Sequence, residues 1–416
     1  MMGNEFIKDM FNKYLYNKSL FKNKEVLSHA YIPENLLHRD RELEDIVSII
    51  IPTIRQEVPS NIFIFGKPGT GKTACVKHIG KELNSLSIKK DLSPSFLYIN
   101  CEMVDTQYRV LSNLLSYYGE NVPLAGWPTD KLYNKFIECI EKKKQIVIIG
   151  LDEIDKLVKK GGDDLLYNLS RINGDLTNSK VVIIGISNDL KFIKYLDSRT
   201  LSSLGHEEIV FPPYNAEQLR DILDNRAKIA FDKEVLLEEV VPLCAAFAAQ
   251  EHGDARKALN LLRMAGEIAE RNNDVKITEE HVRKGKEKLE IDGTTEVIKT
   301  LPVHSKILIY SILLLEKCKT RGIITSEVYS LYERLCGLVQ IERLTYRRIS
   351  DLISELEIIG LINTVLISKG RYGRTKNISL AVDTDTVERA IQDDDRIKSI
   401  TRISHSQQIT LTNHLK

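Results

Sequence analysis

The sequence lacks the features of a membrane or secreted protein. No apolar run in its 416 residues approaches the length of a membrane span, and the N-terminus, MMGNEFIKDMFNKYLYNK, has neither a continuous apolar core nor a small-residue cleavage site. The six cysteines include no C-x-x-C pair, which argues against a zinc site or a disulfide framework and favours a reducing cytoplasm. The net charge is only +1, so the chain as a whole gives no hint of a polyanionic partner.

The clearest motif lies in residues 61–73, NIFIFGKPGTGKT. Its first five residues form a short apolar run with aromatic and β-branched side chains, which predicts a buried strand. The following GKPGTGKT matches the phosphate-loop pattern G-x-x-x-x-G-K-[ST], and ACVKHIGKEL after it has helical spacing. In such a loop, backbone N–H groups surround phosphate oxygens, the lysine reaches the β- and γ-phosphates, and the last hydroxyl holds Mg²⁺. The predicted nucleotide-binding residues are Gly66, Lys67, Pro68, Gly69, Thr70, Gly71, Lys72, Thr73 and Ala74.

The rest of the chain divides into parts of different pattern. Strand-like runs that alternate with helical ones predict a mainly parallel α/β sheet, with strands in 61–65, 95–101, 146–155, 181–189 and 207–214. From 215 to about 291 the pattern is helical, and 291–297 is interpreted as a linker. From 301, three helical segments and a hairpin with a glycine-containing tip predict a winged helix. The predicted parts are an arm (1–30), an α/β core (31–214), a helical domain (215–296), a winged-helix domain (297–385) and a polar tail (386–416).

Polar side chains follow two predicted strands, at the edge where open α/β sheets bind ligands. Asp152 could hold Mg²⁺ through water beside Thr73, and Glu153 could deprotonate the attacking water. Asn188, after the next strand, could hold that water or the γ-phosphate. Arg256, at the start of a long helix, could contact phosphate. Each residue also has a purely structural interpretation. The Asp-Glu pair could be an acidic helix N-cap, Asn188 could form an Asx turn, and Arg256 could be a solvated arginine in the first turn of its helix.

This arrangement resembles the AAA+ ATPases, and more narrowly the archaeal replication initiators related to origin-recognition-complex subunits and the cell-division-cycle loader. The resemblance covers roughly residues 25–385 and implies an α/β AAA+ core, an all-α lid domain and a C-terminal winged-helix domain. It is carried by YIPENLLHRDREL (31–43), FIFGKPGTGKT (63–73), IIGLDEID (148–155), IGISND (184–189), LDSRTLSSLGHEEIVFPPY (196–214) and GDARKALNLLR (253–263).

The resemblance also implies roles for single residues. Arg256 would be the lid arginine called sensor 2, and a helical insertion near 104–135 would touch DNA beside the winged helix. Many relatives carry a Ser-Arg pair before the last strand, and its arginine acts on a neighbouring subunit's ATP. This chain has Ser202-Ser203 there, so either Arg199 serves as that arginine or trans-activated hydrolysis is weak. The residues that would border the adenine are Tyr31, Pro33 and Arg39.

The winged-helix part carries a charge of its own. Residues 301–380 contain 12 Lys and Arg against 7 Asp and Glu, a net charge of +5, which favours contact with phosphate. Basic residues lie at the start of the third helix, and a recognition helix enters the major groove by its N-terminal residues. Other basic residues, with one aromatic residue, form a wing tip suited to the minor groove or to phosphates. The alternative is a docking module for proteins. The predicted DNA-binding residues are Arg343, Arg347, Arg348, Arg371, Tyr372, Arg374 and Lys376.

The sequence and the resemblance together predict an ATP-dependent initiator that binds duplex DNA at replication origins. Its expected cofactors are ATP or ADP with Mg²⁺, and its expected partners are a minichromosome-maintenance-type replicative helicase and paralogous initiators. Hydrolysis would be a slow switch, and the protein would be cytoplasmic and associated with the nucleoid. The alternatives are a clamp-loader-like or chaperone-like ATPase that acts on proteins, and a signal-transducing ATPase that regulates transcription.

Overall fold

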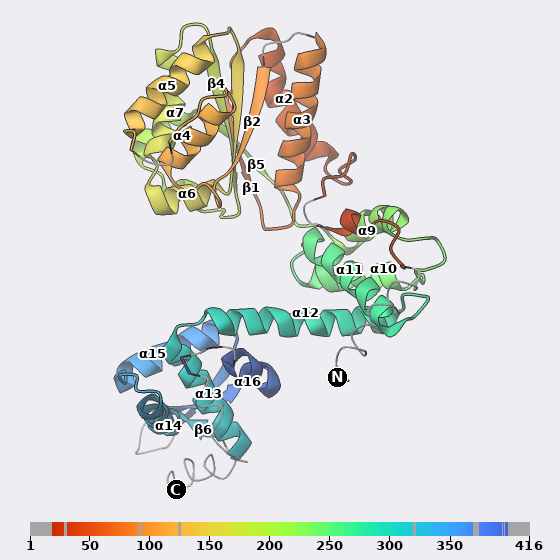
Figure 1. Cartoon of the computed structure of the whole chain (residues 1–416), viewed down its shortest axis with the longest axis vertical. Helices are drawn as coiled ribbons and strands as arrows, with labels where there is room; N and C mark the ends of the chain where they lie inside the picture. The colour runs from red at the N-terminus through yellow and green to blue at the C-terminus, as the bar shows by residue number, and fades with distance from the viewer. Residues whose placement is uncertain are drawn as a thin grey trace, which may run out of the picture. The chain divides into compact units, whose positions relative to one another are not determined.

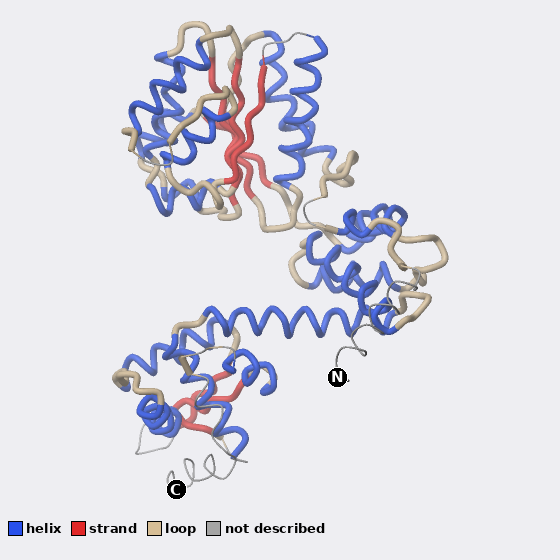
Figure 2. Tube along the Cα trace, viewed as in Figure 1, coloured by secondary structure: helices blue, strands red, loops and turns tan. Residues whose placement is uncertain are grey.

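The computed structural model describes residues 19–28, 31–90, 94–123, 126–318, 322–368, 374–392, 394 and 396–397. The chain forms two compact units that divide between Gly285 and Lys286 (Figures 1 and 2). The first contains a parallel sheet with helices on both faces, followed by a group of helices, and the second contains helices around a small antiparallel sheet. Each unit has its own hydrophobic core.

The sheet of the first unit has five parallel strands in the order β2-β3-β4-β1-β5. This confirms the predicted parallel sheet. The last strand ends at Val210 and not at 214 as predicted, because Pro212 and Pro213 have no N–H with which to continue the ladder. The strands are β1 (Asn61–Phe65), β2 (Pro94–Asn100), β3 (Ile146–Asp152), β4 (Lys180–Ser187) and β5 (His206–Val210).

Alternate side chains of β1 enter different cores on the two faces of the sheet. Ile62 and Ile64 belong to the cluster under α2 and α3, whereas Phe63 and Phe65 belong to the cluster under α4–α7 (Figure 1). The first face is covered by α2 (Asp40–Ile50), η2 (Ile51–Arg55) and α3 (Lys72–Lys90). The second is covered by α4 (Gln107–Ser116), α5 (Thr129–Glu141), α6 (Ile154–Gly161) and α7 (Asp164–Asp175), with η3 (Phe192–Tyr195) and α8 (Ser198–Leu204) before β5.

The helical domain follows the sheet and includes part of the N-terminal arm. The short helix η1 (Lys24–Leu27) packs on it with Val26 and Leu27 buried, and the Phe21 and Phe231 rings lie 4.9 Å apart. The predicted division places an arm at 1–30, but residues 19–28 are a structured part of this domain. Residues 1–18 lie outside the described residues. The main helices are α9 (Ala216–Ala230), α10 (Val240–Gln250) and α11 (Ala255–Asn272).

A single helix, α12 (Glu279–Thr300), crosses the division between the two units. It contains residues 291–297, so the segment predicted to be a linker between the two domains is helical. The hydroxyls of Thr294 and Thr295 donate to the carbonyls of Glu290 and Ile291, one turn earlier, and the segment contains no proline. Such bonds to the carbonyl four residues earlier are compatible with a helix, and the segment continues as α12 to Thr300.

The second unit confirms the predicted winged helix. Its three main helices are followed by a hairpin of β7 and β8, and β8 also pairs with the short β6 in the antiparallel order β6-β8-β7. β6 was not predicted, because a two-residue strand has no detectable period. The elements are α13 (Val303–Cys318), β6 (Ile323–Ile324), α14 (Thr325–Leu338), α15 (Tyr346–Ile359), β7 (Ile362–Ser368) and β8 (Arg374–Leu380).

The start of the predicted polar tail belongs to this unit. A further helix, α16 (Thr384–Gln392), buries Val387 and Ile391 in the core and packs on α13. Beyond it, Asp394 accepts a hydrogen bond from the buried Lys306 ammonium at 2.7 Å. The separation of a tail at 386 is therefore wrong for these residues.

Candidate functional site

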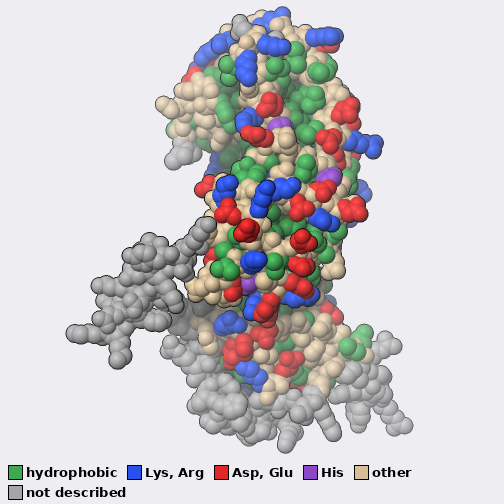
Figure 3. All heavy atoms as spheres, turned by 90° about the vertical axis from the view of Figure 1, so that its right-hand side faces the viewer, with side chains coloured by type: hydrophobic (Ala, Val, Ile, Leu, Met, Phe, Trp, Pro, Cys, Tyr) green, Lys and Arg blue, Asp and Glu red, His purple; other side chains and the backbone are tan. Residues whose placement is uncertain are grey.

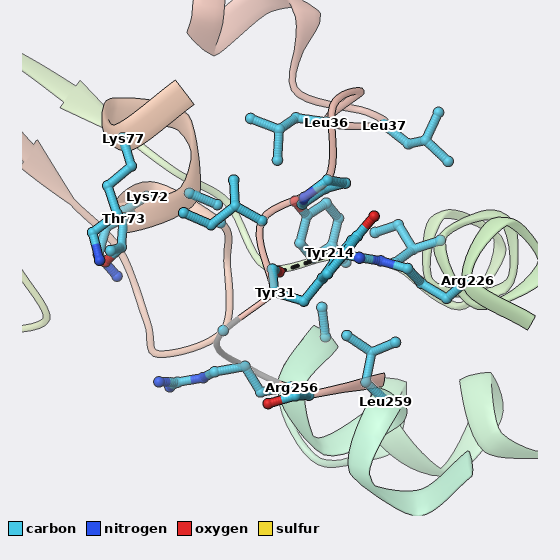
Figure 4. Close-up of a pocket in the computed structure, with 18 of the residues that line it drawn as sticks. Tyr31, Leu36, Leu37, Lys72, Thr73, Lys77, Tyr214, Arg226, Arg256 and Leu259 are labelled. Atoms are coloured by element: carbon cyan, nitrogen blue, oxygen red, sulfur yellow. Dashed lines mark hydrogen bonds between the residues drawn. The ribbon is translucent and has the colours of Figure 1, made fainter. Parts of the chain in front are cut away.

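A cavity of about 540 Å³ lies in the first unit, at the carboxyl ends of the strands and against the helical domain. Figure 4 shows Lys72, Thr73 and Lys77 from α3 on one side of it and Arg256 and Leu259 from α11 on another. The sheet and the helical domain therefore share one cavity.

The phosphate loop encloses the ammonium of Lys72. Its Nζ donates to the carbonyls of Gly66 at 2.7 Å and Lys67 at 2.8 Å, and to Asn188 Oδ1 at 2.8 Å. Gly69 has φ of +74°, in the left-handed region that glycine adopts without strain. Burial lowers the pKa of Lys72 to about 8, against an opposing effect of Asp152.

Thr73 and Asp152 meet at the edge of the sheet. Thr73 Oγ1 donates to Asp152 Oδ2 at 2.8 Å, the Tyr98 hydroxyl donates to the same oxygen at 2.6 Å, and the N–H of Glu153 donates to Oδ1 at 3.0 Å. The described residues contain no cluster of three or more His, Cys, Asp or Glu suited to a metal. One hydroxyl and one carboxylate nevertheless fit Mg²⁺, which takes few protein ligands and keeps water and phosphate oxygens.

Glu153 stands at the N-terminus of α6 with the left-handed backbone angles φ 54° and ψ 40°. Such a conformation is strained for a residue other than glycine and is common at functional sites. Its Oε1 accepts a hydrogen bond from Asn188 Nδ2 at 3.0 Å. Burial, followed by the charges of Glu102 and Asp152, raises the pKa of Glu153. Asn188 thus joins the lysine of the loop to this carboxylate.

The helical domain closes over the phosphate loop through residues 253–256. The N–H of Ala255 donates to the carbonyl of Gly69 at 3.2 Å, and a Cβ at Gly69 would lie 1.7 Å from Asp254 Oδ1. Asp254 also caps α11 by accepting from the N–H of Arg256. The Arg256 side chain is about half exposed, lines the cavity and lies 3.5 Å from Asp254.

The expected adenine-binding residues separate into two groups. Tyr31 and Pro33 line the cavity, and the Arg226 guanidinium lies 4.5 Å from the Tyr31 ring (Figure 4). Arg39 is not among the lining residues. It is 2 % exposed and donates to the carbonyls of Thr70 and Pro212 and to Glu42, so it supports the loop from behind. The placement of Arg39 beside adenine is therefore corrected.

Only some of the phosphate-loop residues line the cavity. Gly66, Lys67, Pro68 and Thr70 do not line the cavity, whereas Gly69, Gly71, Lys72, Thr73 and Ala74 do. Thr70 is buried and donates to the carbonyl of Lys67. Arg199, in α8, is exposed at 62 % of its side chain, pairs with Asp197 and lies away from the cavity lining.

Sequence reasoning missed several lining residues. Tyr98, Glu102, Tyr214, Arg226 and Leu259 come from segments outside the phosphate motifs. Tyr98, three residues before the end of a predicted strand, carried a usable signal, because side chains near strand ends reach the ligand edge of a sheet. Arg226 lies inside an ordinary amphipathic helix and carried none.

The predicted DNA-binding residues differ in how they are held. Arg343 pairs with Glu333 at 2.6 Å, and Arg348 pairs with Glu355 at 3.2 Å. Lys376 donates to Ser354 at 3.0 Å and lies 3.4 Å from Glu357. Arg347, exposed at the start of α15, has no ion pair within the described part of the chain. Arg374 begins β8, and Arg371 and Tyr372 lie outside the described residues.

The fold and the cavity define an AAA+ ATPase core with a lid and a winged helix. Residues 62–213 match the model of the ATPase family associated with various cellular activities, 220–287 match the Cdc6 AAA+ ATPase-type lid domain, and 296–390 match the CDC6 C-terminal winged helix domain. The chain belongs to the ORC1-type DNA replication proteins, which confirms the predicted family.

Relatives and solved structures agree with this placement. The chain is 53 % identical over 411 residues to the ORC1-type DNA replication protein of Thermococcus kodakarensis, covering 98 % of this chain and 99 % of that one. It is 54 % identical over 400 residues to that of Pyrococcus furiosus, covering 95 % of each. The Aeropyrum pernix ORC1 protein, solved in complex with DNA, is 41 % identical with a TM-score of 0.77, covering 91 % of this chain and 98 % of that one. Within the described residues, no helix is long and apolar enough to cross a membrane.

Proposed function

We propose that this protein is an ATP-dependent replication initiator that binds duplex DNA at origins, associates with the nucleoid and helps to load a minichromosome-maintenance-type helicase. The observation that carries the proposal is the hydrogen-bonded set Lys72–Asn188–Glu153, in one cavity with Thr73, Asp152 and Arg256. This set suits the binding and slow hydrolysis of ATP. The 41 %-identical Aeropyrum pernix relative was solved with DNA, which supports the same role for the second unit.

The residues around the loop suggest how nucleotide would be bound. Lys72 has three donors, and all three are used on protein acceptors. To reach a γ-phosphate it exchanges at least one of these bonds for a charge-assisted bond to phosphate, which is stronger. Thr73, and Asp152 through water, would hold Mg²⁺, which would supply positive charge to the phosphate oxygens. Arg256 adds a guanidinium from the lid.

Hydrolysis requires a base, and Glu153 is the candidate. Its raised pKa makes it a better proton acceptor than an exposed carboxylate while it remains ionised. The Asn188 amide holds it in place, so a shift of Asn188 toward phosphate would free the carboxylate for water. Such an exchange suits a slow switch, because the base is restrained until the nucleotide changes the contacts of Asn188.

DNA binding is assigned to the second unit. Arg347, at the first turn of α15, is exposed and has no ion pair among the described residues, so its side chain can reach a base or phosphate. The segment 107–116 forms α4, within the region where the family places a DNA-touching insertion. Contacts with the helicase and with paralogous initiators are proposed from the family alone.

The test is binding to duplex DNA with and without ATP. A gel shift should show a higher affinity for an origin duplex than for a random duplex, and the difference should depend on ATP. Equal, nucleotide-independent binding to both would contradict an initiator role. The absence of duplex binding together with ATP turnover would favour an ATPase that acts on proteins.

A further inference from the structure

Tyr98 contacts the carboxylate assigned to the magnesium site. It lies on β2, lines the cavity and donates its hydroxyl hydrogen bond to Asp152 Oδ2 at 2.6 Å. The same oxygen accepts from Thr73, and Oδ1 accepts from the N–H of Glu153. A carboxylate oxygen accepts and a phenol hydroxyl donates, so Tyr98 is a donor to this carboxylate.

One stripe of α3 packs on β2 beside Tyr98. Residues 73, 77, 80 and 84 are three or four apart and so share one face of the helix. Along this stripe, Lys77 Nζ lies 4.2 Å from the Tyr98 ring, and Asn84 bonds to the backbone of Phe96. A Cβ at Gly80 would lie 2.1 Å from the Phe96 ring, so the helix packs closely on β2 here. The hydroxyl is thus aimed from a rigid strand.

We propose that Tyr98 is a positioning residue for the magnesium site, because its hydroxyl fixes the carboxylate of Asp152 in the orientation that Mg²⁺ and its water require. The inference rests on the proposed function, since it assumes that nucleotide binds with Mg²⁺. A carboxylate without this donor turns more freely about its terminal torsion. Loss of a residue that hydrogen-bonds the groups around a metal typically costs about 10- to 100-fold in metal affinity.

The test is the Mg²⁺ dependence of nucleotide binding by Tyr98→Phe in the full chain. Phenylalanine keeps the ring over which Lys77 lies and removes only the hydroxyl. A fluorescent ATP analogue is titrated in EDTA and then over a series of Mg²⁺ concentrations. We expect the Kd in EDTA to stay within about twofold of wild type, and the Mg²⁺ concentration for half-maximal tightening to rise by about tenfold.

Tyr117→Phe is the matched control. The Tyr117 hydroxyl donates to the backbone carbonyl of Tyr98 at 2.8 Å, so this variant removes a bond to the same residue without touching Asp152. Its Mg²⁺ midpoint should match wild type. An unshifted midpoint in Tyr98→Phe, an equal shift in both variants, or weaker binding by Tyr98→Phe in EDTA would each overturn the proposal. A wild-type protein that binds no ATP analogue at any Mg²⁺ concentration would overturn the proposed function, and with it this inference.

Discussion

Asn188 gives each atom of its side-chain amide to a different partner in the cavity. Oδ1 accepts from Lys72 and Nδ2 donates to Glu153, so one planar group holds a cation and a carboxylate in fixed relation. An aspartate at this position could not donate, and it would add a negative charge beside Glu153. The amide therefore suits a residue that must hold a carboxylate without repelling it.

Glu153→Gln should bind nucleotide as wild type does and lose turnover. The glutamine cannot accept the proton of the attacking water, and general bases typically contribute about 10²- to 10⁴-fold to rate. Nucleotide Kd and steady-state hydrolysis are measured side by side. The control is Glu102→Gln, which removes another cavity carboxylate and should keep most of the activity. Hydrolysis by Glu153→Gln at the wild-type rate would remove the assignment of Glu153 as the base.

Nucleotide binding should weaken as the pH rises above about 8, the pKa of Lys72. Phosphate favours the charged ammonium, so the bound state keeps a proton that the free protein has lost at that pH, and binding takes up a proton. The affinity should fall by up to about tenfold per pH unit above this pKa. Calorimetry at pH 8.5–9.5 in buffers of different ionisation heat would measure the uptake. A binding heat that does not depend on the buffer would contradict the prediction.

The motif residues could be placed from the sequence because short spacings determine their positions. A glycine loop after a strand puts Lys72 and Thr73 at the start of a helix, and the ends of parallel strands bring Asp152 and Asn188 to the same edge. Arg39 could not be placed this way. Its neighbours Thr70 and Pro212 come from segments distant in sequence, and only the packed structure shows that its guanidinium lies behind the loop.

For helices and strands, the structure differs from the sequence-based prediction where the local residue pattern of a segment does not reflect its tertiary contacts. Residues 291–297 contain glycine and two threonines, which predict a linker between domains, and the linker proves to be helical, within α12. The α16 segment is polar overall, but Val387 and Ile391 fall on one face and are buried. The strands and the main helices were predicted because their apolar periods span whole elements.

Two glycine substitutions in helices should have opposite effects on stability. Gly293 is exposed in α12 with no atom within 4 Å of an added Cβ, so Gly293→Ala should raise the free energy of unfolding by about 0.5–1 kcal/mol. Gly80→Ala should lower it, because its Cβ would lie 2.1 Å from the Phe96 ring. Thermal and urea unfolding of both variants test this. A destabilised Gly293→Ala would contradict the description of this helix as regular and exposed.

For the molecule as a whole, the net charge is small, but it is unevenly distributed along the chain. On the face in Figure 3, basic and acidic side chains are interspersed over the described surface. The net charge of the chain is +1, yet residues 301–380 carry +5. Attraction to DNA is therefore expected to depend on this segment and on salt, because phosphate contacts release counterions.

Arg347→Ala should weaken duplex binding more than Lys376→Ala. Arg347 has no ion pair among the described residues, whereas Lys376 is held by Ser354 and Glu357. If Arg347 reads a base, its loss should cost about 1–3 kcal/mol at the preferred site, and if it contacts phosphate, the salt slope should fall by about one. Affinity is measured against salt for origin and random duplexes. Equal effects of the two variants would contradict the ranking, and ATP hydrolysis should be unchanged in both.

The contact of Lys306 with Asp394 determines where the chain can be shortened. A truncation after the wing, at residue 385, would remove most of α16 and expose the apolar face of α13 that it covers. It would also leave the Lys306 ammonium, 5 % exposed at its side chain, without its carboxylate partner. A buried charge without a partner typically costs about 3–5 kcal/mol. A C-terminal fluorophore or affinity tag should therefore follow Ile397, and shortened versions that end at the wing should be prone to aggregation.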